Sequence, residues 1–161
     1  MRPALLLGIL VALAAPAGSQ AAGCTRVAGS FSVVPGSAGA GNVVYALRLQ
    51  NTSAHACLLS RLPQLRLLAT AGPSPKLLPT KVVADPRYTP HPLLLLPGAR
   101  AIATARFSPD VPGPGEPVSN RRCEPVARYA AVVVAGTRFV VRVRPPTSVC
   151  EHGRLVFTPY R

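Results

Sequence analysis

The sequence predicts an all-β protein, folded as a single antiparallel β-sandwich of about seven or eight short strands with Greek-key connections. The first observation behind this is the alternation of apolar and polar residues over several short runs, which is typical of half-buried strands. The second is the presence of 19 prolines, spread through the chain, which argue against long helices. Four Cys residues provide the third observation, because two disulfides suit a compact β-domain of this size.

The expected strands follow one another between turn-rich connections. Val43–Asn51 shows the clearest pattern, with apolar residues at the odd positions and Arg48 and Gln50 among the even ones. Further strands are expected at Leu65–Leu67, Arg100–Phe107, Tyr129–Val134, 138–143 and Leu155–Phe157. The connection Ala71–Pro92 is predicted to be a loop of roughly 20 residues, a length typical of functional or disordered loops.

The first 23 residues, "MRPALLLGILVALAAPAGSQAAG", have the pattern of a secretory signal peptide. Arg2 is followed by an apolar run from Ala4 to about Ala15 and then by small residues. The run is shorter than the roughly 20 residues that a spanning helix needs. We expect cleavage between Ala21 and Cys24. Residues 24–161 would then form the secreted domain, which contains no apolar run long enough to be a transmembrane segment.

A lipid anchor at Cys24 is the lesser alternative. The stretch "AAGC" resembles a weak lipobox, in which this cysteine would carry the lipid. The leucine that usually stands three positions before the cysteine is missing, and the spacer "PAGSQ" separates the apolar run from it. A cleaved and unanchored protein is therefore the favoured prediction.

The four cysteines allow three disulfide pairings. We favour Cys24–Cys57 and Cys123–Cys150, because each bridge then joins neighbours along the chain. Loops of about 30 residues closed in this way contribute on the order of 3–4 kcal/mol through the lost entropy of the unfolded chain. A lipid on Cys24 would deprive Cys57 of this partner.

The order of several motifs resembles a known family. The motifs are Gly41-Asn42, the alternating strand with its "QNTS" turn, Cys57-Leu58-Leu59, Leu62-Pro63, "LLLLPGARAIATARF", Cys123 and Cys150. Together they resemble domain of unknown function 4232, a family of secreted domains found chiefly in actinobacteria. The resemblance implies an immunoglobulin-like sandwich in a Gram-positive cell envelope, and it implies no activity. One departure is Arg61, which stands where the family usually has glycine.

Charge provides the main indication of function. The chain has 18 Lys and Arg against five Asp and Glu, a net charge of +13 that becomes +12 once Arg2 is removed. Such a balance favours anionic partners through long-range attraction. The candidate anion-binding residues are Arg138, Arg142 and Arg144, which share one parity of a strand, and Arg121 and Arg122 beside Cys123. The expected partners are an anionic cell-wall polymer or an envelope protein, and not nucleic acid. Alternatively, the arginines only keep the domain soluble.

Neither catalytic residues nor a cofactor is predicted, and the chain is not expected to be an enzyme. The five acidic residues are scattered, with no pair at a spacing that suits acid–base catalysis. A zinc site can be drawn from His55, Cys57, Cys150 and His152, but disulfide bonding would remove both thiolates. We therefore expect a non-enzymatic binding module. The alternative is a metal-binding carrier or a hydrolase built on the same sandwich.

Overall fold

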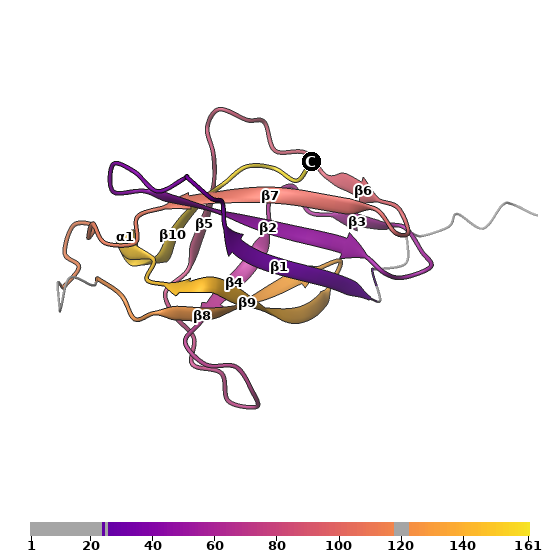
Figure 1. The fold of residues 1–161 in the computed structure, drawn as a ribbon. Coiled ribbons are helices and arrows are strands. Elements are labelled where there is room, and N and C mark those ends of the chain that lie inside the picture. Colours follow the sequence, from indigo (N-terminus) through magenta and orange to yellow (C-terminus); the bar gives the residue numbers. More distant parts are fainter. Residues whose placement is uncertain (1–23, 25, 118–122) are drawn as a thin grey trace, which may run out of the picture.

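The computed structural model describes residues 24, 26–117 and 123–161 (Figure 1). These residues form ten strands and one short helical turn. The elements are β1 (Val27–Val33), β2 (Val43–Asn51), β3 (Cys57–Leu59), β4 (Gln64–Leu68), β5 (Lys81–Ala84), β6 (Leu93–Leu95), β7 (Arg100–Phe107), β8 (Ala127–Val134), β9 (Thr137–Thr147), α1 (Cys150–Gly153) and β10 (Arg154–Phe157). The predicted signal peptide, residues 1–23, lies outside the described residues.

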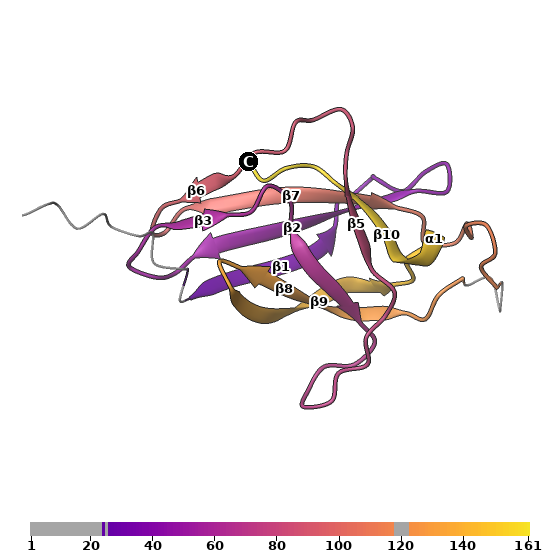
Figure 2. The same ribbon diagram turned by 180° about the vertical axis from the view of Figure 1, so that it is seen from behind.

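Eight strands form one sheet in the order β4-β8-β9-β1-β2-β7-β10-β5, and β3 and β6 pair separately. The sheet curls around the interior, with β2 and β7 on one side and β8 and β9 on the other (Figures 1 and 2). The two end strands, β4 and β5, come close together, and the backbone N–H of Leu67 donates to Thr80 Oγ1 at 2.9 Å beside this junction. The predicted all-β class with two disulfides is confirmed.

The structure does not show the predicted immunoglobulin-like sandwich but this single, nearly closed sheet. The physical reason lies in β1, which pairs with β2 along one edge and with β9 along the other. Two layers that a sandwich would keep separate are thereby joined by main-chain hydrogen bonds. The β1–β9 pair is parallel, as is the β5–β10 pair, so the sheet is mixed and not purely antiparallel.

The core is built from the inward-facing residues of β2 and β7, which pair in register over eight positions, from Val43 opposite Phe107 to Gln50 opposite Arg100. Tyr45 lies at its centre, with its ring centroid 5.4 Å from that of Phe31 and 5.2 Å from that of Phe107. Tilted aromatic pairs at such distances stabilise a core beyond the area that they bury. Alanines of β7 face this cluster and leave room for the rings.

The disulfides join Cys24 to Cys57 and Cys123 to Cys150, the pairs that the sequence favoured. Their Cα atoms lie 5.1 and 5.5 Å apart, within the usual range for a disulfide. The first bridge fixes the start of the described chain to β3, and the second fixes the segment before β8 to α1. A sulfur bonded to Cys57 is not free to carry lipid, so this pairing argues against an anchor at Cys24.

The predicted loop Ala71–Pro92 contains β5, which pairs in parallel with β10 at the end of the sheet. Its sequence, "KVVA", is too short to show an alternating pattern, so the strand escapes prediction. Beyond β5, the buried carboxylate of Asp85 accepts hydrogen bonds from Arg87 Nε and Nη2, at 3.0 and 2.7 Å. These bonds lower the pKa of Asp85 to about 2. The segment is therefore held by both main-chain and side-chain contacts.

The helical content of the described residues is confined to α1, and nothing there is long or apolar enough to cross a lipid bilayer.

Gly153, at the end of α1, provides a test of this architecture. Its φ is +75°, and a Cβ added there would overlap the carbonyl group of Pro79, just before β5. Gly153→Ala is therefore expected to lower the free energy of unfolding by about 3 kcal/mol, through backbone strain and this overlap. Chemical denaturation at neutral pH measures the change.

Gly136→Ala is the matched control. Gly136 also has a positive φ, of +81°, but a Cβ there would meet open space. The expected loss is only about 1 kcal/mol, the cost of a left-handed conformation for alanine. Equal losses for the two variants would show that α1 and Pro79 are not packed as described.

Candidate functional site

The outer face of β9 presents the arginines that the sequence singled out. Val141 and Val143 point into the core, whereas Arg138, Arg142 and Arg144 are exposed. This follows from the alternation of side chains along a strand. Arg48, Arg66 and Arg106, on other strands, are also exposed. Arg121 and Arg122 lie outside the described residues.

The structure separates these arginines into two places. Arg142 and Arg144 line a shallow hollow of about 210 Å³, together with Arg128 and Tyr129 of β8. Arg138 lies instead in a larger groove beside β4. The described residues include no carboxylate that forms a salt bridge with any of the three arginines of the hollow. We call the hollow that Arg128, Arg142 and Arg144 line the arginine hollow.

Arg128 was missed by the sequence analysis. It lies in the irregular stretch between Ala127 and Tyr129, where the pairing of β8 with β9 shifts register. Tyr129 lies opposite Arg142, whereas Ala127 lies opposite Thr147, so β9 contains several additional residues here. The position of a bulge is not readable from alternation alone. The signal that could have suggested it is "RPPT" in β9, because proline disrupts regular pairing.

A second basic hollow lies on the outer face of β1, β2 and β7. Its volume is about 510 Å³, and Arg48, Arg100 and Arg161 are among the residues that line it. Arg48 Nη1 donates to Ser32 Oγ at 3.1 Å, so part of its hydrogen-bonding capacity is used within the protein. The positive charge of the chain is thus spread over two outer faces of the sheet.

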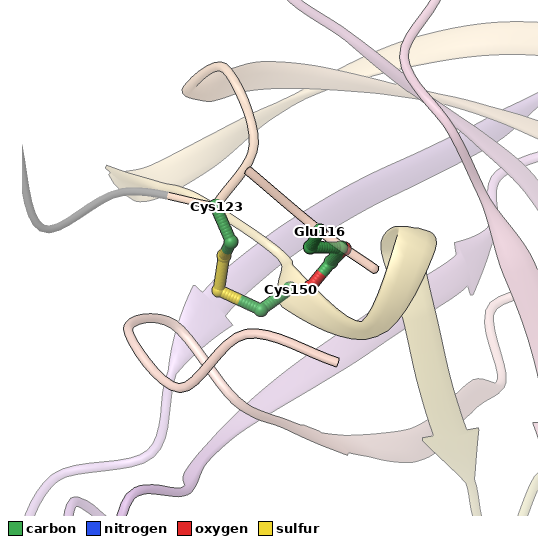
Figure 3. A group of neighbouring side chains, drawn as sticks. All are labelled: Glu116, Cys123 and Cys150. Carbon is green, nitrogen blue, oxygen red and sulfur yellow. A yellow bond between two sulfur atoms is a disulfide. The ribbon is translucent and has the colours of Figure 1, made fainter. Parts of the chain in front are cut away.

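The buried carboxylate of Glu116 has a structural role next to the Cys123–Cys150 bridge (Figure 3). It accepts hydrogen bonds from the backbone N–H groups of Gly113 at 2.5 Å, of Glu151 at 2.8 Å and of His152. Successive N–H groups that converge in this way form an anion-binding concavity. Burial acts to raise the pKa of Glu116, but the three backbone hydrogen bonds outweigh it and hold the pKa below its ordinary value.

The convergence depends on the backbone of α1. Glu151 and His152 have φ values of +56° and +55°, which turn their N–H groups toward the same carboxylate. The segment that carries Glu116 is thereby tied to the end of the chain that carries Cys150. Among the described residues, this is the largest number of backbone hydrogen bonds that any carboxylate accepts.

Glu116, Glu124 and His152 place ligand-type atoms within 4.8 Å of one another. The oxygens of Glu116 already accept the three backbone hydrogen bonds, so the group is explained by local folding. Burial and the neighbouring charge of Glu116 raise the pKa of Glu124. The zinc site drawn from the sequence has no thiolates, because Cys57 and Cys150 belong to different disulfides. The two buried acids, Asp85 and Glu116, both serve the fold.

These features define a disulfide-linked all-β domain whose outer faces are rich in arginine and whose buried acids are held by hydrogen bonds. Residues 24–161 match the family described as domain of unknown function (DUF4232), and the chain belongs to that family. Comparison with curated proteins and with solved structures finds no match. The family resemblance deduced from the motif order is therefore confirmed.

The role of Glu116 predicts a specific dependence of stability on pH. A pKa below the ordinary 4.5 means that the ionised carboxylate stabilises the fold above that pH, and that this contribution is lost as the pH falls through the lowered value. Glu116→Gln is expected to lower the free energy of unfolding by about 2–3 kcal/mol at pH 7, because charge-assisted hydrogen bonds are lost. Denaturant titrations from pH 7 to pH 3 should show the difference from wild type shrinking.

Glu151→Gln is the control, since its carboxylate makes an exposed ion pair with Arg154 at 3.1 Å. Such a pair contributes less than about 1 kcal/mol. A loss for Glu116→Gln that is as small as this, or that does not change with pH, would contradict the structural role of Glu116.

Proposed function

We propose that this chain is a non-enzymatic binding module that holds an anionic polymer against the arginine hollow. The observation that supports it best is the presence of Arg128, Arg142 and Arg144 around one hollow, with no salt bridge to the described carboxylates. A guanidinium group presents two parallel N–H donors to a phosphate or carboxylate. Three such groups can grip successive anionic groups of a polymer.

The proposed setting is the cell envelope of an actinobacterium. An N-terminal segment with the pattern of a signal peptide supports export, and two disulfides suit an oxidising compartment. Outside the cell, the polymers that match the net charge of +12 left after removal of Arg2 are wall phosphopolymers and acidic glycans. Nucleic acid is not expected there.

The alternative function, a metal carrier or hydrolase, receives less support. A hydrolase would require carboxylates that are free to exchange protons with a substrate. Asp85 instead binds Arg87, and Glu116 binds the backbone of its own chain. Both buried carboxylates of the described residues are thus committed to the fold.

The test compares two triple variants that remove the same charge from different faces. Arg128, Arg142 and Arg144 are changed to Gln in one, and Arg48, Arg100 and Arg106 in the other. Binding to inorganic polyphosphate and to poly-glutamate is measured by fluorescence titration at low salt, and binding to isolated envelopes by co-sedimentation. The first variant is expected to weaken polyphosphate binding about tenfold or more relative to the second.

Equal weakening by the two variants would show that net charge alone attracts the polymer, and it would contradict a site at the arginine hollow. Binding to poly-glutamate but not to polyphosphate would identify carboxylate as the preferred group. Thermal denaturation of both variants checks the fold, which these exposed substitutions should leave intact.

A further inference from the structure

The two ends of the curled sheet leave main-chain groups that bond to no other strand among the residues that the structure describes. β4 and β5 are its end strands and do not pair with each other. Leu78 N donates to Leu67 O at 2.9 Å, and Leu67 N donates to Thr80 Oγ1. Beyond Thr80, where β5 begins, the returning chain separates from β4 and pairs with β10 instead. Figure 2 shows β4 and β5 from the side on which they approach each other.

The separation opens a groove of about 1120 Å³. Gln64, Leu65 and Arg66 of β4 line one side, and Thr80 and Val82 line the other. We call this the edge groove. It is distinct from the arginine hollow, with which it shares no lining residue.

The main chain of Leu65 points into the edge groove. Leu67 directs both its N–H and its C=O away from β8, toward Leu78 and Thr80. The hydrogen-bonding groups of a strand in an antiparallel pair alternate from one side to the other, so those of Leu65, two residues earlier, point the same way. No turn or loop segment of the described chain bonds to them. One donor and one acceptor are therefore presented to the groove.

The side chains around this edge are basic and apolar. Arg61, Arg66 and Arg138 line the edge groove, and its lining includes neither Asp nor Glu. Leu77, at its rim, is 61% exposed and so offers an apolar contact to a ligand in the groove. The groove is thus complementary to a ligand that carries negative charge, apolar side chains and a main chain.

We propose that the edge groove docks an extended acidic segment of a partner protein, which adds to the edge of β4 beside Leu65. In this mode, main-chain hydrogen bonds provide affinity and alternate side chains provide specificity. Every second residue of the docked segment would place its carboxylate beside Arg61, Arg66 or Arg138. The residues between them would contact Leu77 and Val82. A phosphopolymer lacks the N–H donor that the carbonyl of Leu65 requires and the apolar groups that suit Leu77.

A second copy of this chain is a poor occupant. The five acidic residues are scattered through a chain of net charge +13, and no two of them lie two positions apart as an alternating acidic strand would require. Approach of two such chains is also opposed by their charge. The ligand class that matches the edge groove is therefore an acidic peptide from a different protein.

The experiment uses the mature chain and a fluorescein-labelled peptide in which valine and glutamate alternate. Fluorescence anisotropy is expected to show saturable binding. Arg61→Gln with Arg66→Gln should weaken it about tenfold or more, whereas Arg142→Gln with Arg144→Gln should leave it within about twofold. The same peptide with N-methylated backbone amides should bind at least about tenfold more weakly, because methylation removes the donors that pair with β4.

Amide hydrogen exchange identifies the strand involved. The N–H of Leu65, for which the described residues provide no partner, should become protected when the peptide binds, whereas that of Leu67, already bonded to Thr80 Oγ1, should change little. Equal binding of the N-methylated peptide, equal loss in the two double variants, or no binding up to about 1 mM peptide would each overturn the proposal. Failure of this proposal is distinguishable from failure of the proposed polymer site, because the polymer site is tested with variants of the arginine hollow and not of the edge groove.

Discussion

The structure depends on one constraint, the alternation of side chains along β2 and β7. These two strands pair without interruption, and over the paired positions their inner residues are all apolar, whereas Arg48, Arg100 and Arg106 on the outer side are exposed. Tyr45, Leu47 and Phe107 form the centre of the core, and Phe31 of β1 closes over it. Because β1 also pairs with β9, the same core is shared by both sides of the curled sheet. A core with few aromatic residues is thereby covered by one continuous sheet.

The same alternation distributes the charge. Every strand that turns an apolar residue inward must turn its neighbour outward, and in this chain arginine often takes the outward position, as at Arg48, Arg106 and Arg142. Acidic residues are rare, and the two buried ones are fixed in place, Asp85 by Arg87 and Glu116 by the backbone of α1. The positive outer faces are therefore left largely uncompensated, and this is the basis for proposing that they bind anions.

The sequence predicted what local alternation encodes. The bounds expected for two strands, Val43–Asn51 and Arg100–Phe107, are those observed, because both strands have one buried and one exposed face. β1, β3, β5 and β6 were missed, since "VAGSFSV" is rich in small residues and the other three strands have only three or four residues each. Pairing partners were also beyond prediction: alternation shows which face is buried, but not that β1 would join β2 to β9. The neighbour pairing of cysteines was predictable because each bridge closes a short loop.

The same distinction applies to the residues of the candidate sites. The exposure of Arg138, Arg142 and Arg144 follows from their parity, but their division between two hollows follows from a register shift near Arg128 that depends on the whole β8–β9 pair. The backbone cradle of Glu116 depends on two positive φ values that no residue type in "CEHG" requires, apart from the glycine. Features set by one strand are visible in the sequence, and those set by two strands or by an unusual backbone are not.

The sheet does not close because of how its two end strands, β4 and β5, are held. Closing it would require β4 and β5 to exchange backbone hydrogen bonds, yet Thr80 meets Leu67 through its hydroxyl group and so keeps the two backbones apart. From Lys81 onward, β5 pairs with β10 at four positions. Just before β5, the carbonyl group of Pro79 packs so closely against Gly153 that a Cβ there would overlap it. β10 follows α1, which the Cys123–Cys150 bridge fixes in place. By pairing with β5, β10 thus holds β5 away from β4. An open edge beside Leu65 is therefore a consequence of how the C-terminal strand is anchored.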